Sequence, residues 1–367
     1  MFDFIFPPLS RQVGTRRGGK PACRSLGAGR EGLEPLKALI PVAGIGTRLQ
    51  PLTNKVPKVL INVAGKPMLF HLIDELVKND KIDTVILIIG YLGEEVKKAV
   101  NNFYSGRNVK FEYIEQKEML GLGHAVYHAK DLVGDEPLLI VLGDTIFEFD
   151  LESVLTLEYS SIGVKDVEDT TRFGIVESEN GFVTRMIEKP APGVTNSKAA
   201  IAGIYLVKSG FKLFKAVEYL IGNNIRTKNE YQLTDALMKL VNDGEVMVPF
   251  EIQNWFDCGK PETLISTNAY LLKRDYNSNN KYEIPNSKII PPVFIGENCI
   301  IENSTIGPHT TIADNSKIKN STITNSLICE GASVTDANLD EVILGNGESI
   351  YSEHKRIVKG DNSIISF

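Results

Sequence analysis

Apolar runs with the length of buried strands alternate with segments of helical periodicity in the first part of the chain. The strand-like runs are 37–43, 84–90, 109–115 and 138–143. Between them, apolar residues recur at helical spacing in segments that begin at Pro67, Glu94 and Gly123. Strands and helices that alternate at this length predict right-handed βαβ units and a mostly parallel sheet with helices on both faces. We therefore expect an α/β fold.

A different pattern follows a polar stretch at 274–288. Apolar residues recur at every fifth or sixth position, with small polar residues and glycines between them; they are Ile300, Ile306, Ile312, Ile318, Ile323, Ile328, Val334 and Leu339. This spacing is typical of a β-helix, in which inward residues stack coil upon coil. A β-sandwich would instead show alternation with period two. The repeat is long enough for roughly three coils.

These patterns divide the chain into four parts. Residues 1–36 carry scattered arginines, glycines and prolines without periodicity, so we expect a disordered extension or a misplaced start codon there. Their apolar residues precede their charges, which is the reverse of a secretory signal. We expect the α/β domain at 37–272, a linker at 273–290, and the β-helix with a tail at 291–367.

Composition argues against several classes of function. The 367 residues are 43% hydrophobic and 23% charged, which is ordinary for a soluble protein. The net charge of -6 argues against a nucleic-acid-binding surface, and no apolar run of the sequence approaches the roughly 20 residues that span a bilayer. The four cysteines have no paired spacing, so we expect neither a zinc site nor a disulfide framework. A reducing cytoplasm fits this composition best.

The glycine-containing segment GIGTR at 44–48 directly follows the first predicted strand. Glycines at such a position let backbone N–H groups approach phosphate oxygens, and Arg48 and Lys58 would add fixed positive charge. The spacing differs from that of the dinucleotide-binding and P-loop motifs. Considered alone, the segment is equally compatible with a tight turn between a strand and a helix.

Two carboxylates stand at the ends of predicted strands. Asp144 follows the apolar run at 138–143, and Asp257 follows a short apolar and aromatic run. Two carboxylates at one edge of a sheet can share Mg²⁺, which takes its other ligands from phosphate oxygens and water. An aspartate at a strand end is also common as a helix cap or a turn residue, and the pattern leaves both interpretations open.

Three further charged residues are suited to a sugar phosphate. Glu188 and Lys189 in the segment MIEKP offer a hydroxyl acceptor beside a cation, and Glu230 offers a second acceptor. The alternative for the pair is a solvated loop. For Glu230 it is a favourable charge in the first turn of a helix that Thr227 or Asn229 caps.

Taken in chain order, these segments resemble the sugar-1-phosphate nucleotidylyltransferase family. IPVAGIGTRLQPLT and PKVLINVAGKPML resemble its N-terminal signature, and its later motifs are matched by EQKEMLGLGHAV, LLIVLGDTIF, FGIVE, MIEKP, AIAGIY, NEYQLTDAL and WFDCGKPETL. The resemblance covers 37–272 and implies a Rossmann-like catalytic domain. The repeat resembles the short left-handed β-helix of the family's long members. For each segment above, the resemblance favours the ligand-binding alternative.

The resemblance also implies roles for individual residues. Those expected to bind the nucleotide are Gly44, Gly46, Thr47, Arg48, Gln116 and Gly121, the last two at the base. Those expected to bind the sugar and its phosphate are Gly174, Glu188, Lys189, Gly203 and Glu230. The expected Mg²⁺ ligands are Asp144 and Asp257, and the expected catalytic cations are Arg48, Lys58 and Lys189.

The implied reaction joins a nucleoside triphosphate to a sugar 1-phosphate with Mg²⁺, giving an NDP-sugar and pyrophosphate. An in-line attack by the sugar phosphate on the α-phosphorus needs no covalent enzyme intermediate. The amide of Gln116 carries a donor and an acceptor, which match the edge of uracil or thymine. We therefore expect UTP or dTTP and, by resemblance, glucose 1-phosphate. The open ends of a β-helix favour self-association, so a homo-oligomer is expected.

Three alternatives remain at this point. The segment at 57–69 also resembles branches that use other nucleotides, including mannose-1-phosphate guanylyltransferase. A bifunctional uridylyl- and acetyltransferase would use the β-helix for its second activity, with His309 as the candidate residue in the repeat. A catalytically silent regulatory subunit would have lost cations or metal ligands, all of which this sequence retains.

Overall fold

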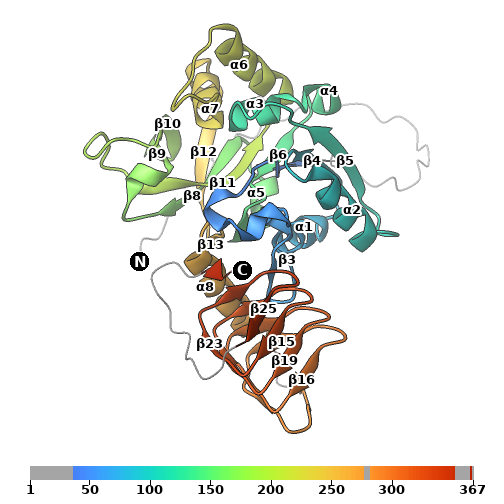
Figure 1. Ribbon diagram of the computed structural model, residues 1–367. Coiled ribbons are helices and arrows are strands. Elements are labelled where there is room, and N and C mark those ends of the chain that lie inside the picture. Colours follow the sequence, from blue (N-terminus) through green and yellow to red (C-terminus); the bar gives the residue numbers. More distant parts are fainter. Residues whose placement is uncertain (1–35, 277–281, 352–363, 366–367) are drawn as a thin grey trace, which may run out of the picture. The chain divides into compact units, whose positions relative to one another are not determined.

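The computed structural model describes residues 36–276, 282–351 and 364–365 (Figure 1). The chain divides into the units Met1–Glu34 and Pro35–Phe367, and every described residue belongs to the second. The extension expected at 1–36 lies outside the described residues, except for Leu36, which is buried as the first residue of strand β1 (Leu36–Pro41). Within the described part, no helix is long and apolar enough to cross a membrane.

Four parallel strands form one half of a nine-stranded sheet. Their order is β6 (Leu138–Val141), β1, β4 (Ile82–Ile89) and β5 (Lys110–Glu115). In register, Leu39 of β1 lies between Ile140 of β6 and Ile86 of β4. These strands are almost continuously apolar because both faces of the sheet are covered. Their carboxyl ends lie at one edge, where ligands bind in folds of this class.

The other half of the sheet contains both antiparallel and parallel pairs. Strand β11 (Ala199–Val207) runs antiparallel to β6, and β9 (Gly174–Glu179) and β10 (Phe182–Glu188) follow it outward. Strand β8 (Ser160–Asp166) pairs with β11 and, in parallel, with β12 (Met247–Glu251). The result is a mixed sheet whose Rossmann-like half carries the parallel strands.

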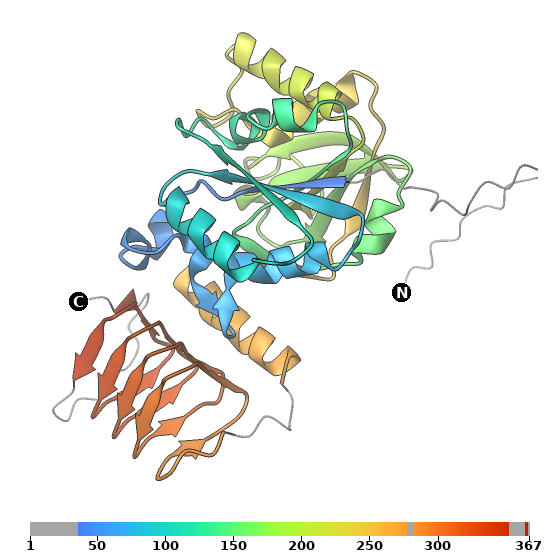
Figure 2. The same cartoon turned by 90° about the vertical axis from the view of Figure 1, so that its right-hand side faces the viewer.

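Helices cover the two faces of the sheet (Figures 1 and 2). One face is covered by α1 (Met68–Val77), α2 (Gly93–Phe103) and α5 (Leu151–Leu155). The other is covered by α3 (Leu122–Tyr127), α4 (Lys130–Val133), α6 (Gly210–Gly222) and α7 (Leu233–Asn242). Each face has its own apolar core.

Two helix predictions need correction. The helix expected over 123–133 is divided into α3 and α4, because the backbone N–H groups of His128 and Ala129 donate to carbonyls three residues back, at Ala125 and Val126. Pro67 does not open helix α1 from its first position. It precedes the helix as its cap and ends the short hairpin of β2 (Asn62–Val63) and β3 (Lys66–Pro67).

Three stacks of short parallel strands form the left-handed β-helix. The first stack is β14 (Lys288–Ile289), β17 (Thr305–Ile306), β20 (Thr322–Thr324) and β23 (Asn338–Asp340). The second is β15 (Val293–Ile295), β18 (Thr310–Ile312), β21 (Leu327–Ile328), β24 (Ile343–Leu344) and β26 (Ile364–Ile365). The third is β16 (Ile300–Glu302), β19 (Lys317–Lys319), β22 (Ser333–Thr335) and β25 (Ser349–Tyr351).

The register of these stacks corrects the predicted set of inward residues. Ile301, which is 6% exposed, aligns with the inward Ile318 and Val334, whereas Ile300 is 50% exposed. Neighbouring residues of a strand point to opposite sides, so only one of the two isoleucines can face the core. The repeat is also longer than the predicted three coils, since every stack holds at least four strands. Its first strand, β14, and the end of the preceding helix lie within the linker expected at 273–290.

Helix α8 (Pro261–Arg274) joins the α/β domain to the β-helix. Its fully buried Asn268 accepts hydrogen bonds at Oδ1 from Ala64 N (2.9 Å) and from Thr311 Oγ1 (2.6 Å). Its Nδ2 donates to the His309 carbonyl at 3.2 Å. One asparagine thus connects the β2–β3 hairpin, α8 and the β-helix.

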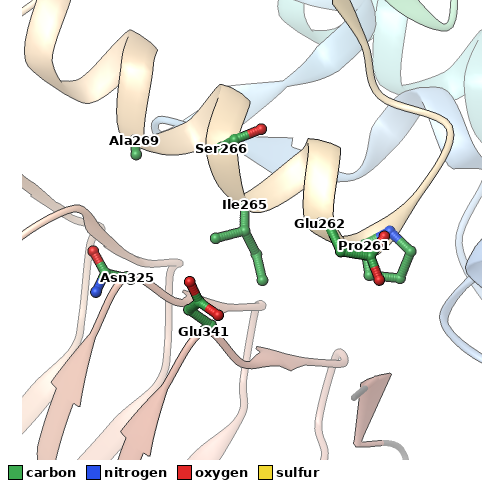
Figure 3. A pocket seen from close by; sticks show the side chains of 7 residues that line it. All are labelled: Pro261, Glu262, Ile265, Ser266, Ala269, Asn325 and Glu341. Carbon is green, nitrogen blue, oxygen red and sulfur yellow. The ribbon is translucent and has the colours of Figure 1, made fainter. Parts of the chain in front are cut away.

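Apolar packing reinforces this junction. One buried cluster contains Leu49 and Leu52 of the α/β domain, Leu271 of α8, and Leu327 and Ile343 of the β-helix. A cavity of about 210 Å³ lies beside it, lined on one side by α8 and on the other by the β-helix. Figure 3 shows the residues that line this cavity, which are Pro261, Glu262, Ile265, Ser266, Ala269, Asn325 and Glu341.

Candidate active site

A cavity of about 620 Å³ lies beyond the carboxyl ends of the parallel strands. This volume is in the range of small-molecule sites. Ten of the predicted site residues line it: Gly44, Gly46, Thr47, Arg48, Lys58, Gln116, Gly121, Asp144, Glu230 and Asp257. Residues from distant parts of the sequence therefore meet in one cavity.

The glycine-containing loop forms one wall of this cavity. It leaves β1 and enters the short 3₁₀ helices η1 (Thr47–Leu49), η2 (Leu52–Asn54) and η3 (Lys58–Leu60). Gly46 has φ of 71°, and a Cβ there would lie 3.0 Å from Lys58 Cβ, so this position requires glycine. Its carbonyl accepts a hydrogen bond from Thr53 Oγ1 at 2.9 Å. Around Gly44 no atom lies within 4 Å of the Cβ position, which leaves room for a ligand.

An ion pair between Lys58 and Asp144 lines the cavity. Lys58 Nζ lies 2.8 Å from Asp144 Oδ2; the Lys58 side chain is 12% exposed and that of Asp144 is 47% exposed. Burial opposes ionisation of Asp144, but the Lys58 ammonium and a hydrogen bond from Thr145 outweigh it and lower the pKa of the carboxyl. Asp144 is therefore an anion at neutral pH, beside a fixed cation.

Asp257 reaches the same cavity from another strand. The antiparallel ribbon of β7 (Thr145–Glu148) and β13 (Asn254–Asp257) pairs Asp257 with Thr145, the residue after Asp144. Oδ1 of Asp257 accepts a hydrogen bond from Gly259 N at 3.0 Å. The pairing explains how two strand-end carboxylates become neighbours.

The donor set fits Mg²⁺. Among the described residues, no group of three or more His, Cys, Asp and Glu side chains is placed to hold a metal. Two carboxylates that line a cavity beside a glycine-containing loop suit Mg²⁺, because this ion usually takes one or two carboxylates and completes its shell with water and substrate phosphates. Asp144 and Asp257 are the residues that would hold it.

Gln116 and Gly121 also line the cavity. Gln116, 6% exposed, follows β5, and its Nε2 donates to the Gly121 carbonyl at 3.4 Å. Gly121 has φ of 113°, and a Cβ there would lie 2.7 Å from the Tyr231 carbonyl. Because Leu120 and Gly123 both hydrogen-bond to the backbone of Tyr231, the neighbouring Glu230 is brought to the same cavity.

Four predicted sugar-site residues are not among those that line the cavity: Gly174, Glu188, Lys189 and Gly203. Gly174 pairs with Glu188 across β9 and β10, and a Cβ on Gly174 would lie 3.1 Å from Glu188 Oε2. Glu188 accepts a hydrogen bond from Thr234 Oγ1 at 2.8 Å, and its Oε1 lies 3.2 Å from Lys189 Nζ.

Gly203 lies next to the cavity without lining it. Its carbonyl accepts from the N–H of Leu142, which does line the cavity, and a Cβ at Gly203 would lie 2.7 Å from the Leu142 side chain. The structure thus brings Gly174, Glu188 and Lys189 together, and places Gly203 beside the wall.

Sequence reasoning missed two residues near the site. Arg172, in the 3₁₀ turn η4 (Thr170–Arg172), has Nη2 3.9 Å from Asp257 Oδ2. Its only signal was its position just before the FGIVE segment. His124 Nδ1 lies 3.4 Å from Gln116 Nε2, and its signal was its place three residues after Gly121 in a motif already singled out.

Comparisons with known proteins agree with this geometry. Residues 37–274 match the sequence model of the nucleotidyl transferase family. The chain is 35% identical over 268 residues to the bifunctional protein GlmU of Methanocaldococcus jannaschii, covering 72% of the chain and 61% of that relative. It therefore spans less than two thirds of the length of this relative.

Solved structures show the same fold. A UDP-glucose pyrophosphorylase complexed with UDP-glucose superposes with a TM-score of 0.56 and 25% identity, covering 65% of this chain and 99% of the other. A Bacillus anthracis protein assigned as a glucose-1-phosphate thymidylyltransferase gives a TM-score of 0.55 and 28% identity, covering 66% and 96%.

Proposed function

The chain belongs to the nucleotidyl transferase family, and from this premise we propose that it transfers a nucleotidyl group from UTP or dTTP to glucose 1-phosphate. The coarser activity, that of a sugar-1-phosphate nucleotidyltransferase, is supported by its relatives. The observation that carries the proposal is the Lys58–Asp144 ion pair, which lies in one cavity with the glycine-containing loop and Asp257. Two polyanions must meet in this reaction, and the cavity supplies the compensating charge.

In the proposed reaction, a phosphate oxygen of the sugar 1-phosphate attacks the α-phosphorus in line, and the bond to the β-phosphate oxygen breaks to release pyrophosphate. The backbone of the loop at 44–48 holds the triphosphate, and Arg48 neutralises the pyrophosphate as it leaves. Lys58 keeps Asp144 ionised and fixed in place. Lys189, held with its neighbour Glu188, binds the phosphate of the sugar, and Gly174, Glu188, Gly203 and Glu230 bind its hydroxyls.

Mg²⁺ held by Asp144 and Asp257 would neutralise phosphate charge and order the triphosphate. The chain's own part is to position the reactants. Catalysis of phosphoryl and nucleotidyl transfer rests largely on positioning and electrostatic stabilisation, because little covalent chemistry falls to the protein.

The choice of substrates rests on Gln116, which lines the cavity, and on the relatives. Gln116 can hydrogen-bond to the imino and carbonyl groups of uracil or thymine. A structural relative binds UDP-glucose, and another is assigned to glucose 1-phosphate and thymidylyl transfer. We infer the same substrates here, with uracil and thymine separated only by one methyl group.

A second candidate function is that of a bifunctional enzyme with an acetyltransferase site on the β-helix. The relative named GlmU is bifunctional, and His309 sits at a corner of the β-helix with Nδ1 3.1 Å from Asn325 Oδ1. Transfer of an acetyl group from acetyl-CoA to an amino-sugar phosphate would add this second activity to the first. A regulatory role without catalysis is disfavoured, because Arg48, Lys58 and both metal ligands line one cavity.

We also infer the setting in which the enzyme works. The described cysteines Cys258, Cys299 and Cys329 are free, which fits a reducing cytoplasm. The β-helix exposes apolar side chains such as Ile300 and Tyr351, which are 50% and 74% exposed, so it offers a surface for a homo-oligomer. Light scattering of the purified protein tests the assembly.

The deciding experiment incubates the protein with each nucleoside triphosphate, a panel of sugar 1-phosphates and Mg²⁺, and measures pyrophosphate. We expect UTP and dTTP with glucose 1-phosphate to give the highest kcat/KM. A preference for GTP with mannose 1-phosphate would replace the proposed substrates with those of a guanylyltransferase. No pyrophosphate with any pair would refute the proposed activity.

A further inference from the structure

The side-chain amide of Gln116 has a defined direction. Its Nε2 is directed at the Gly121 carbonyl and at His124 Nδ1, both 3.4 Å away. Among the described residues, Oε1 has no hydrogen-bond partner, although the residue is only 6% exposed and lines the cavity. The amide therefore presents its oxygen, rather than its NH₂ group, to a ligand.

The ring of His124 can hold this direction only in one protonation state. His124 Nδ1 lies 3.4 Å from the NH₂ group of Gln116. In the neutral ring that carries its proton on Nε2, Nδ1 is an acceptor, which matches this NH₂ group. In the imidazolium both nitrogens are donors, and Gln116 Nε2 would face another N–H.

We propose that His124 is a positioning residue for base recognition: it fixes the Gln116 amide so that Oε1 accepts the imino N–H of the base. This inference rests on the proposed function and names a determinant of its nucleotide specificity. Uracil and thymine carry an N–H at ring position 3, whereas cytosine has an unprotonated acceptor there. An amide held in this direction selects UTP and dTTP against CTP, because CTP leaves two acceptors facing each other.

The same arrangement makes base selection depend on pH. Protonation of His124 turns its acceptor into a donor, so the Gln116 amide rotates and presents NH₂ to the base. The selected base edge is then the acceptor edge of cytosine. Discrimination between UTP and CTP is therefore high while His124 is neutral and falls as the ring is protonated.

The groups around His124 set where this change occurs. Burial lowers the pKa of His124 below its ordinary value of 6.5. His128 on the next helical turn, with ring centroids 4.6 Å apart, and Arg226 before α7 act in the same direction, while Glu118 opposes them. Glu230, which lines the cavity, is engaged by Gln232 Nε2 at 3.0 Å. The ring is thus neutral at pH 7.5 and becomes protonated only below pH 6.5.

The test compares the ratio of kcat/KM for UTP and CTP in four proteins between pH 5.5 and 8. In the wild type this ratio should fall as the pH decreases below 6.5, toward a value roughly tenfold smaller once the ring is protonated, since a donor then replaces the acceptor at Nδ1. His124→Phe should have the reduced ratio at every pH. His124→Asn places an amide oxygen near the position of Nδ1 but cannot titrate, so it should keep the ratio of the wild type at pH 7.5 and show no decrease in acid. His128→Phe removes one of the groups that lower the pKa of His124, so it should keep the ratio of the wild type at pH 7.5 and move the acidic decrease to higher pH.

His128→Phe should also keep the kcat of the wild type at saturating UTP, because neither the base contact nor the phosphate ligands are changed. A His124→Phe variant with the ratio and pH profile of the wild type would overturn the inference. If no nucleotide is turned over, the proposed function fails, and calorimetric binding of UTP and CTP across the same pH range still tests the role of His124. Equal affinity for both nucleotides at pH 7.5 would refute it.

Discussion

The ammonium of Lys58 lies 2.8 Å from Oδ2 of Asp144, a residue 86 positions further along the chain. This contact joins the segment after the glycine-containing loop to the end of β6. It also fixes a carboxylate in the cavity where we propose that the two phosphate-bearing substrates bind. The same ion pair thus connects two distant segments of the fold and supplies charged groups for the proposed reaction.

Replacing Asp144 should abolish turnover without unfolding the protein. Asp144→Asn keeps the shape of the side chain but removes the charge that would hold Mg²⁺, and we expect kcat to fall by about 10²-fold or more. Pyrophosphate release at saturating Mg²⁺ measures the loss. The matched control is Glu251→Gln at the exposed end of β12, which should leave turnover unchanged. Near-normal turnover of Asp144→Asn would remove Asp144 from the metal site.

Lys189→Ala should weaken the sugar 1-phosphate far more than the nucleotide. The substitution removes a cation held with Glu188, and the loss of one charge-assisted contact should raise the KM for sugar 1-phosphate by about tenfold or more. Lys198→Ala is the control, because that lysine pairs with the exposed Glu168. A rise in the KM for the nucleotide alone would mean that Lys189 contacts the triphosphate rather than the phosphate of the sugar.

Asn268→Ala should destabilise the whole molecule rather than the active site. The substitution removes an acceptor for Ala64 N–H and Thr311 Oγ1 and a donor to the His309 carbonyl. Buried groups left without partners should lower the free energy of unfolding by about 2–3 kcal/mol. Urea unfolding measures this loss, and Ser266→Ala on the exposed side of α8 should show almost none. An unchanged unfolding curve for Asn268→Ala would mean that the junction is held by apolar packing alone.

Stability should fall in mildly acidic solution because of His71. Burial lowers its pKa to about 4, Lys66 and Arg274 act in the same direction, and a hydrogen bond to the Val63 carbonyl opposes them. The unfolded chain binds a proton near pH 6.5 that the folded protein does not bind until about pH 4. The stabilisation is therefore fully present above pH 6.5 and is lost as the pH falls toward 4.

When the pH is lowered from 7.5 to 5, the titration of His71 should reduce the free energy of unfolding by about 2 kcal/mol. His71→Gln, which retains an N–H for the Val63 carbonyl, removes the titration. Urea unfolding at the two pH values should show a smaller decrease for His71→Gln than for the wild type. His128→Gln is the control. Equal decreases in the wild type and in His71→Gln would contradict this assignment.

The parts of the fold that depend on local pattern could be predicted from the sequence. The buried strands can be recognised because they are apolar throughout, and Asp144 and Gln116 can be assigned to their carboxyl edge because each comes shortly after such a strand. The β-helix was found by its period, but the period did not distinguish Ile300 from Ile301. Both are apolar, and only the register against Ile318 decides which one faces inward.

The contacts between distant segments could not be predicted from the sequence. Nothing near Lys58 indicates that its partner is Asp144, and nothing near Arg172 indicates Asp257. Such pairs follow from how sheets and loops meet in space, which residue type and spacing leave open. For the same reason, nothing near Glu188 indicates that its carboxylate accepts a hydrogen bond from Thr234 and lies against Gly174.

Helix α8 has a consequence for exchanging parts between relatives. Asp257 ends β13, α8 begins at Pro261, and the same helix carries the buried Asn268 that binds Thr311 of the β-helix. The polar stretch after residue 274 looks like a boundary between interchangeable modules, but the molecule does not divide there. A chimaera that receives a foreign β-helix at that stretch would pair Asn268 with whatever residue replaces Thr311. The natural graft point lies before α8, so the tail of this protein can be transplanted only together with the helix that follows Asp257.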